Sequence, residues 1–238
     1  MIYKPNFKLI IGDREETQNL LEFVVVLSAK FHTQHCELKI SNITPGIDEK
    51  IELYLGYEKL YPVFKGYITD VSDKQVKYIK AKDEYIKLQN KKITASFNRT
   101  TPREIINSII SYPKVLSEKS FIQKHHFPIW NESIDTALRR IQKTWNLQNF
   151  VWFFDIEGNF HFHEVKKLKD YKTQISDEMI KVIHPRKEFT EVSLTKPTFD
   201  IYPLYAIKVL QKTFLVESVI HKYSDKKLNT ILKLSNLS

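Results

Sequence analysis

Apolar and polar residues alternate in short stretches along the first third of the chain, and turn residues separate these stretches. The clearest stretch is residues 50–55, where Ile51, Leu53 and Leu55 fall on one face of an extended strand. Further strands are predicted at residues 7–11, 23–27, 37–40, 63–69 and 76–81. Gly66 lies inside one of them and indicates a bulge or a close approach of another backbone segment. Short strands at this regular spacing predict an antiparallel barrel or sandwich.

The pattern changes near residue 100, where a helix is predicted to begin. Thr101 is a capping residue, Pro102 takes the first helical position and Glu104 stands three residues after the cap. The apolar residues that follow share one helical face: Ile105, Ile106, Ile109 and Ile110. Pro113 then ends the helical pattern, because proline removes a backbone donor and clashes with the preceding turn.

A second helix is predicted after Asn131 or Ser133. Its apolar residues recur at offsets of 3, 4, 7 and 11: Ile134, Ala137, Leu138, Ile141 and Trp145. The basic residues of this segment fall away from that stripe: Arg139, Arg140 and Lys143. A helix with this pattern buries one face and exposes the other.

Two aromatic stretches, residues 150–154 and 159–163, flank a turn that closes at Gly158, and they predict a hairpin. The β pattern returns from Met179 onward. Clear strands are expected at residues 205–210, 214–221 and 229–234. The chain therefore reads as a β block, an αβ insert and a second β block, with boundaries near residues 85 and 166.

The composition favours a globular, β-rich protein. Of the 238 residues, 42% are hydrophobic, 27% are charged and 13% are aromatic, and aromatic residues favour half-buried sheet surfaces. A single cysteine excludes a disulfide scaffold. The five glycines are too dispersed for a glycine-rich phosphate loop, which excludes nucleotide chemistry based on such a motif.

The formal net charge of +9 first suggests a nucleic-acid partner. The lysines are scattered singly and in pairs, however, and they form no basic run of the kind that marks a nucleic-acid patch. We therefore expect most of the positive charge to lie on solvated outer surfaces.

No targeting or membrane segment is evident in the sequence. Residues 1–5 lack the apolar region of a signal peptide, and the longest apolar stretch, residues 23–27, is far shorter than the ~20 residues of a membrane-spanning helix. The protein is expected to be made in a cytoplasm. Unpaired Cys36 agrees with a reducing compartment and is expected to be a small core residue of its strand.

His161 and His163 are two residues apart on one predicted strand, so both project from the same face. Two such histidines can begin a metal site, but no third ligand with suitable spacing is evident. A half-exposed strand face of the hairpin is the favoured interpretation.

The remaining soft-ligand groups are weaker metal candidates. His32, His35 and Cys36 lack the partner pair of a zinc finger or ribbon, and consecutive His125 and His126 point to opposite sides of an extended segment. Serine-hydrolase and zinc-protease motifs are absent too. We expect no catalytic residue, no metal and no cofactor.

The hairpin aromatics are the one feature that could bind single-stranded nucleic acid by stacking: Trp152, Phe153, Phe154, Phe160 and Phe162. They occupy both faces of the hairpin, which favours a core that the second helix covers. A binding or assembly protein without chemistry of its own remains.

Several ordered stretches resemble the baseplate hub proteins of contractile phage tails and related injection machines, the late control protein D and tail-hub family. Residues 62–68 and 81–88 are similar to the family's strand with a phenylalanine-x-glycine end and its aspartate-led segment, and residues 101–110 match the following helix. Residues 131–145 and 153–162 are similar to its glutamate-serine helix and aspartate-glycine hairpin, and they are the most specific match.

Residues 214–223 and 230–234 resemble the closing strands of the family's second barrel. The chain is short for this family, and residues 12–33 match only in pattern. We expect no lysozyme or spike domain after Ser238, and we expect any peptidoglycan cleavage to belong to another chain.

The resemblance implies a mainly β fold with an α+β insert, in which two tail-tube-like antiparallel β-barrels flank a small αβ domain. The implied domains are residues 1–85 (first barrel), 86–166 (two helices and the aromatic hairpin) and 167–238 (second barrel, which can share strands with the first). Three chains would then present six similar barrels in a pseudo-hexameric ring.

The resemblance also implies partners and a location. The homotrimer would join the hexameric tail tube protein to the central spike protein within the baseplate of a virion, and would contact other baseplate proteins. The tape measure protein is a further candidate partner. The alternative from the residues is a basic single-stranded nucleic-acid-binding protein that uses the aromatic hairpin, and a hydrolase is the third candidate.

Overall fold

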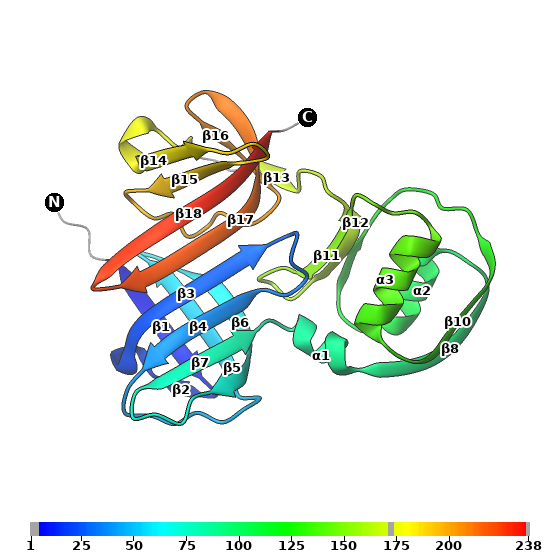
Figure 1. Cartoon of the computed structure of the whole chain (residues 1–238), viewed down its shortest axis with the longest axis horizontal. Coiled ribbons are helices and arrows are strands. Elements are labelled where there is room, and N and C mark those ends of the chain that lie inside the picture. Colours follow the sequence, from blue (N-terminus) through cyan, green and yellow to red (C-terminus); the bar gives the residue numbers. More distant parts are fainter. Residues whose placement is uncertain (1–4, 171–173, 237–238) are drawn as a thin grey trace. The chain divides into compact units, whose positions relative to one another are not determined.

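The computed structural model describes residues 5–170 and 174–236. The regular structure is mainly β, with nearly all strand pairs antiparallel and a few short helices (Figure 1), which confirms the predicted fold class. The chain divides into two compact units. Met1–Asp83 with Lys167–Ser238 form the first, here called the sheet unit, and Glu84–Lys166 form the second, here called the insert unit.

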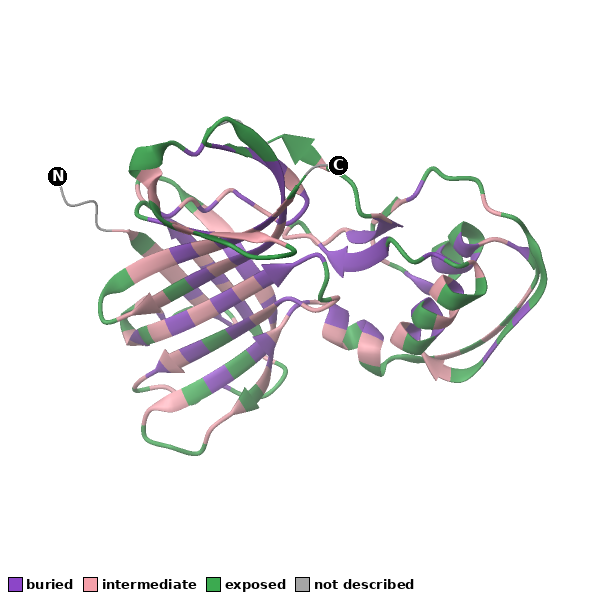
Figure 2. Ribbon diagram, turned by 45° about the horizontal axis from the view of Figure 1, so that its top comes forward, coloured by how far each residue is buried: buried purple, intermediate pink, exposed green. Residues whose placement is uncertain are grey.

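The first β block of the sheet unit forms a continuous antiparallel sheet in the order β3-β4-β7-β6-β5-β1-β2. A short 3-10 turn, Thr17–Asn19, precedes β3. The strands are β1 (Asn6–Ile11), β2 (Arg14–Glu15), β3 (Leu20–Ser28), β4 (His35–Ile40), β5 (Lys50–Gly56), β6 (Leu60–Val71) and β7 (Lys77–Lys82). Figure 2 shows buried residues alternating with more exposed ones along these strands, the period of two that the sequence predicted.

The second β block extends this sheet. Its strands are β13 (Lys169–Asp170), β14 (Ile180–Pro185), β15 (Thr190–Leu194), β16 (Tyr205–Val209), β17 (Lys212–Ser224) and β18 (Lys227–Asn236). They pair in the order β14-β15-β18-β17, while β16 pairs with β17 and, in parallel, with β13. A 3-10 turn, Asp177–Met179, precedes β14.

Strand β17 joins the two blocks. It pairs with β16 through residues 212–215 and with β3 through residues 218–223. Ser218 lies opposite Ser28 and Tyr223 lies opposite Phe23. Figure 1 shows β17, in orange to red, beside β3, in blue, although the two are far apart in the sequence. The two blocks therefore share one 13-stranded sheet, and we call the β3–β17 pairing the seam.

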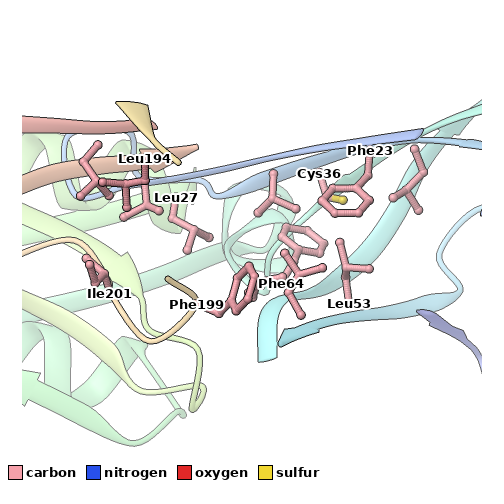
Figure 3. Close-up of a cluster of buried hydrophobic side chains, with 14 of the residues drawn as sticks. Phe23, Leu27, Cys36, Leu53, Phe64, Leu194, Phe199 and Ile201 are labelled. Carbon is pink, nitrogen blue, oxygen red and sulfur yellow. The ribbon is translucent and has the colours of Figure 1, made fainter. Parts of the chain in front are cut away.

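One hydrophobic core serves both blocks. The close-up in Figure 3 shows side chains of this core from the first block (Phe23, Leu27, Cys36, Leu53 and Phe64) and from the second (Leu194, Phe199 and Ile201). The interpretation of Cys36 as a core residue of its strand is confirmed, since its side chain is fully buried in β4. Burial raises the pKa of this thiol, so it remains protonated and unreactive.

Gly66 in β6 allows the close backbone approach that the sequence indicated. A Cβ atom at this position would lie 2.1 Å from the backbone oxygen of Lys82 in β7. The β6–β7 register also shifts nearby, between Ile68 and Asp70. No side chain fits between these two strands at Gly66.

We expect Gly66→Ala to lower the free energy of unfolding by about 1–3 kcal/mol, because the new methyl group forces strands β6 and β7 apart. Urea unfolding measures the change. The matched control is Gly46→Ala, whose Cβ would meet only the Glu49 side chain, at 3.6 Å. Equal losses in the two variants would contradict the steric explanation.

The insert unit combines three helices, a two-stranded ribbon and a three-stranded sheet among the residues that the structure describes. Its elements are α1 (Tyr85–Asn90), β8 (Lys92–Thr100), α2 (Pro102–Ile109), β9 (Lys114–Leu116), β10 (Lys124–Ser133), α3 (Ile134–Thr144), β11 (Phe150–Phe154) and β12 (Phe160–Glu164). Strand β8 pairs with β10, and the β11–β12 hairpin adds β9 in parallel.

Both predicted helices begin where their caps indicated. The Thr101 side chain accepts a hydrogen bond from the Glu104 backbone N–H, and the Glu104 carboxylate accepts one from the Thr101 N–H, so the capping box is complete. Ser133 caps α3 by accepting from the Thr136 N–H at 3.1 Å. The apolar stripes of both helices are buried in the core of the insert unit.

The prediction of two helices and a hairpin in this region is incomplete. It lacks the short helix α1, strand β9 and, above all, the β8–β10 ribbon. The ribbon packs one face on the insert core through Phe127, Ile129 and the half-buried Phe97. Its other face carries exposed residues.

Candidate functional site

The aromatic hairpin is part of the core of the insert unit. Its five predicted aromatic residues are at most 4% exposed: Trp152, Phe153, Phe154, Phe160 and Phe162. The prediction that these rings form core is confirmed. Stacking on single-stranded nucleic acid needs exposed rings, so the nucleic-acid alternative has no support from this hairpin.

His161 and His163 form a chain of hydrogen bonds on the hairpin face opposite Trp152. The His161 Nε2 atom lies 3.0 Å from the Asp155 carboxylate, and His161 Nδ1 lies 3.1 Å from His163 Nε2. His163 Nδ1 donates to the backbone oxygen of Glu164 at 2.7 Å. His161 Nδ1 and His163 Nε2 share one proton, so one of these two atoms donates to the other.

The environment of this chain explains the pKa directions of its end groups. Burial lowers the pKa of His163. Burial raises the pKa of Asp155, but hydrogen bonds from His161 and Asn159 outweigh this effect and leave the pKa lowered. The ring of His161 also stacks on Phe153, with centroids 4.7 Å apart. The cluster therefore fixes the hairpin and its turn.

The prediction of a half-exposed histidine face is wrong. His161 is 5% exposed and His163 is fully buried. The sequence correctly places both histidines on one face of the strand. It does not reveal that this face of the hairpin is buried, like the face that carries Trp152. The signal that could have found the cluster is Asp155, six residues before His161 and at the start of the turn.

Among the described residues, the other candidate metal ligands do not come together in a metal site. Cys36 points into the core of the sheet unit, while His125 and His126 are exposed neighbours on β10. His126 lies 3.0 Å from the Asn98 side chain through its Nδ1 atom. Over residues 5–170 and 174–236, no group of three His, Cys, Asp or Glu side chains could hold a metal ion.

His221 is a buried titratable residue that the sequence did not single out. It lies on β17 at the seam, opposite Val25 of β3 and Thr230 of β18. Its Nδ1 atom lies 2.8 Å from the Thr230 hydroxyl, and Phe199 packs 5.8 Å from its ring. Burial lowers the pKa of His221 to about 3, so the ring is neutral in the folded protein.

This lowered pKa predicts a pH dependence of stability. Below pH 6.5 the unfolded chain takes up a proton at His221, whereas the folded chain does not. The contribution of the neutral ring to the free energy of unfolding is therefore complete at neutral pH and declines toward pH 3. At pH 4.5 the loss is about 2–3 kcal/mol. Urea unfolding at pH 7 and pH 4.5 should show this loss in the native chain and not in His221→Gln. The same pH difference in both proteins would contradict the assignment.

A groove of about 570 Å³ opens on the insert unit between residues 119–124 and 144–150. Its lining contains no histidine or cysteine, and its one carboxylate, Glu164, accepts a hydrogen bond from Ser117 at 2.7 Å. Burial raises the pKa of Glu164, but that hydrogen bond and others outweigh it and leave the pKa lowered. A carboxylate of this kind is a poor general base, so the groove offers no acid–base machinery.

The ends of the large sheet are the surfaces best suited to assembly. Among the described residues, β14 binds no strand at its outer edge. At the other end of the sheet, β2 pairs with Ile10 and Ile11 of β1 and residues 16–17 bond the backbone of Leu9, which leaves residues 6–8 without a strand on that side. Exposed sheet edges can pair with another chain. Strand β14 carries exposed Lys181 and Pro185, which limit uncontrolled pairing. We call these surfaces the β14 edge and the β1 edge.

The sequence matches no family model and no curated protein. Solved structures do match. A 43 kDa tail protein of prophage MuSo2 from Shewanella oneidensis is 13% identical with a TM-score of 0.76, and the match covers 97% of each chain. A tail protein from Neisseria meningitidis MC58 is 10% identical with a TM-score of 0.68, over 98% of this chain and 97% of that one.

A third similar structure is the E. coli c3393 protein, a component of the type VI secretion system with structural similarity to the T4 bacteriophage tail proteins gp27 and gp5. It is 12% identical with a TM-score of 0.69, over 97% of this chain and 77% of that one. The chain therefore has the fold of phage tail proteins and of this secretion-system component. None of the described helices is long and apolar enough to cross a membrane.

Proposed function

We propose that the protein is the structural baseplate hub of a phage tail or of a phage-derived contractile injection particle. In this role three copies form a pseudo-hexameric ring that joins the hexameric tail tube to the central spike. The observation that carries the proposal is the fold match to a prophage tail protein over 97% of both chains.

The sheet unit supports a ring on physical grounds. Two β blocks per chain, joined at the seam, give six blocks in a trimer, which suits a sixfold tube on one side and a threefold spike on the other. The β14 edge and the β1 edge are different surfaces, so contact between them is head-to-tail. Such contacts close into rings when the rotation per copy allows it.

The proposed role is structural and not enzymatic. The partners are other copies of this chain, the tail tube protein, the central spike protein, other baseplate proteins and the tape measure protein, and the location is the tail baseplate of the particle. The buried histidines fit this role because their hydrogen bonds stabilise the hairpin and the seam.

The mass of the protein in solution tests this proposal. We expect a trimer, or a monomer that becomes trimeric when the tube or spike protein of the same particle is added. Light scattering at several concentrations measures the mass, with a tail protein of an unrelated particle as the control partner. The ring would be contradicted by a chain that stays monomeric with the tube protein and with the spike protein of its own particle. A stable dimer would contradict it as well.

A further inference from the structure

The β8–β10 ribbon of the insert unit has one closed edge and one open edge. Pro128 of β10 lies opposite Ser96 of β8, and proline has no N–H to donate. The backbone oxygen of Pro128 accepts a hydrogen bond from Arg140 of α3, so it points away from β8. Pro128 and Ser96 therefore form a wide, non-hydrogen-bonded pair, in which the backbone groups of both residues point outward.

The edge of β10 is closed by α3. Arg140 bonds the Pro128 oxygen, forms a 3.2 Å ion pair with Glu132 and lies 4.5 Å from the centre of the Phe127 ring. A proline and a half-buried ion pair leave no room for another strand there. Any added strand must therefore pair with β8.

The outer edge of β8 offers free backbone groups. By the period of two, Thr94 and Asn98 direct their N–H and C=O groups outward like Ser96, and all three residues are exposed. Within residues 5–170 and 174–236, β10 is the only strand that pairs with β8. The backbone groups of these three residues make no turn or loop hydrogen bond within the described part of the chain either. This edge can accept about eight residues of an extended chain.

Positive charge predominates around this edge. Glu104 lies at the Arg99 end of β8, where its carboxylate accepts hydrogen bonds from Thr100 and Thr101. Residues 85–103 and 119–131 contain no aspartate or glutamate, although they carry seven lysine and arginine residues: Lys87, Lys91, Lys92, Arg99, Arg103, Lys119 and Lys124. All of these except Lys87 lack an ion-pair partner in the described part of the chain. Lys91 and Lys92 stand at one end of β8, and Arg99 and Arg103 stand at the other. Lys92 and Arg99 are seven positions apart along β8, a span of about 23 Å.

We propose that the outer edge of β8 is a docking site for an extended acidic segment of a partner protein, which adds to the ribbon as a third strand. The backbone groups of Thr94, Ser96 and Asn98 provide the strand pairing. The lysine and arginine residues at both ends select aspartate and glutamate side chains. The middle of the segment is neutral, because the exposed face of β8 carries only small polar side chains there.

Two other occupants fit the ribbon less well. The β8 edge of a second copy carries the same positive charge, so two such edges repel each other. Single-stranded nucleic acid needs several exposed rings, and Trp130, which is 80% exposed, is the one exposed Phe, Tyr or Trp ring on the described ribbon. An acidic peptide strand uses both the free backbone groups and the charge.

A displayed library of random 12-residue peptides, selected on the full chain, tests the proposal. The expected peptides contain aspartate or glutamate near both ends and β-branched residues between them. Lys92→Glu/Arg99→Glu should weaken their binding at least tenfold. The control, Lys143→Glu/Lys166→Glu, makes the same change in net charge on exposed residues outside the ribbon and should leave binding within twofold.

A second variant tests the strand pairing itself. Ser96→Pro removes an outward N–H that the ribbon does not use, so the fold should survive and peptide binding should fall at least tenfold. In the native chain, bound peptide should slow hydrogen exchange of the outward amides of Thr94, Ser96 and Asn98. If Ser96→Pro fails to fold, the charge variants and the exchange data still show whether the peptide binds at the outer edge of β8.

Three results would overturn the proposal. The first is a selection that yields no peptides or no enrichment of acidic ones. The second is binding that persists in both ribbon variants. The third is oligothymidylate that binds at the ribbon in place of acidic peptides, which would assign the surface to nucleic acid. The proposed ring involves the sheet unit, so a failure here leaves it standing, and a failure of the ring leaves this site standing.

Discussion

Replacing Trp152 with alanine should lower the free energy of unfolding of the insert unit by about 3–5 kcal/mol. Trp152 is fully buried in the core of this unit, so the substitution leaves a large cavity. It also removes a hydrogen-bond donor from a network that connects separate elements. Trp152 is therefore the residue whose loss this unit should tolerate least.

The network runs from β11 through α1 to α3. Trp152 Nε1 donates to the Tyr85 hydroxyl at 2.7 Å, and that hydroxyl donates to the Asp135 carboxylate at 2.5 Å. Arg139 Nε donates to the same carboxylate at 2.9 Å. Burial raises the pKa of Tyr85 and the bond to Asp135 raises it further, so the hydroxyl keeps the proton that it donates.

Hydrogen exchange of amides in α3 reports the stability of this unit directly. The matched control is Trp130→Ala on β10, which removes a ring that is 80% exposed and should change stability by at most about 0.5 kcal/mol. Similar losses in the two variants would show that the Trp152 network does not hold the insert unit together.

Val219→Asp should destabilise the whole sheet unit by about 4 kcal/mol or more, because it puts a carboxylate into the shared core. Val219 is fully buried on β17, opposite Leu27 of β3 and Leu232 of β18. Because both β blocks meet at this strand, the loss should appear in both. Exchange of amides in β5 and in β15 should accelerate together.

The control for this variant is Lys222→Asp, an exposed position three residues further along the same strand. It introduces the same side chain into β17 without burying its charge, so its effect should stay below about 1 kcal/mol. Faster exchange in β15 alone, with β5 unchanged, would contradict the view that the seam makes the two blocks one cooperative sheet.

The sequence predicts elements well where local chemistry decides the structure. Capping side chains satisfy backbone donors locally, so they mark where a helix begins. Thr101 and Glu104 mark the start of α2, and Ser133 marks the start of α3. The alternation of Ile51, Leu53 and Leu55 gives β5 because one face of that strand is buried.

The β8–β10 ribbon shows how a usable signal can be missed. Ile93, Ala95 and Phe97 alternate with polar residues, which is a strand pattern. The pattern of β10 is interrupted by Pro128, a residue that argues against a strand unless the strand lies at an edge. Recognising an edge requires the pairing partner. For Pro128 this is Ser96, 32 residues away, and local periodicity does not reveal it.

The candidate sites were predictable only in part. Residue type and spacing place His161 and His163 on one face, but burial of that face depends on packing that no local pattern encodes. The same holds for His221, whose buried position follows from the seam between strands distant in sequence. Long-range pairing therefore sets the properties of these histidines.

The central claim, that this chain is the hub ring of a tail, is tested most directly by imaging the assembled particle with electron microscopy. We expect three copies of the chain in one ring between the end of the tail tube and the spike, with the sheet units forming the ring. A chain located on the capsid or at the periphery of the baseplate would contradict it.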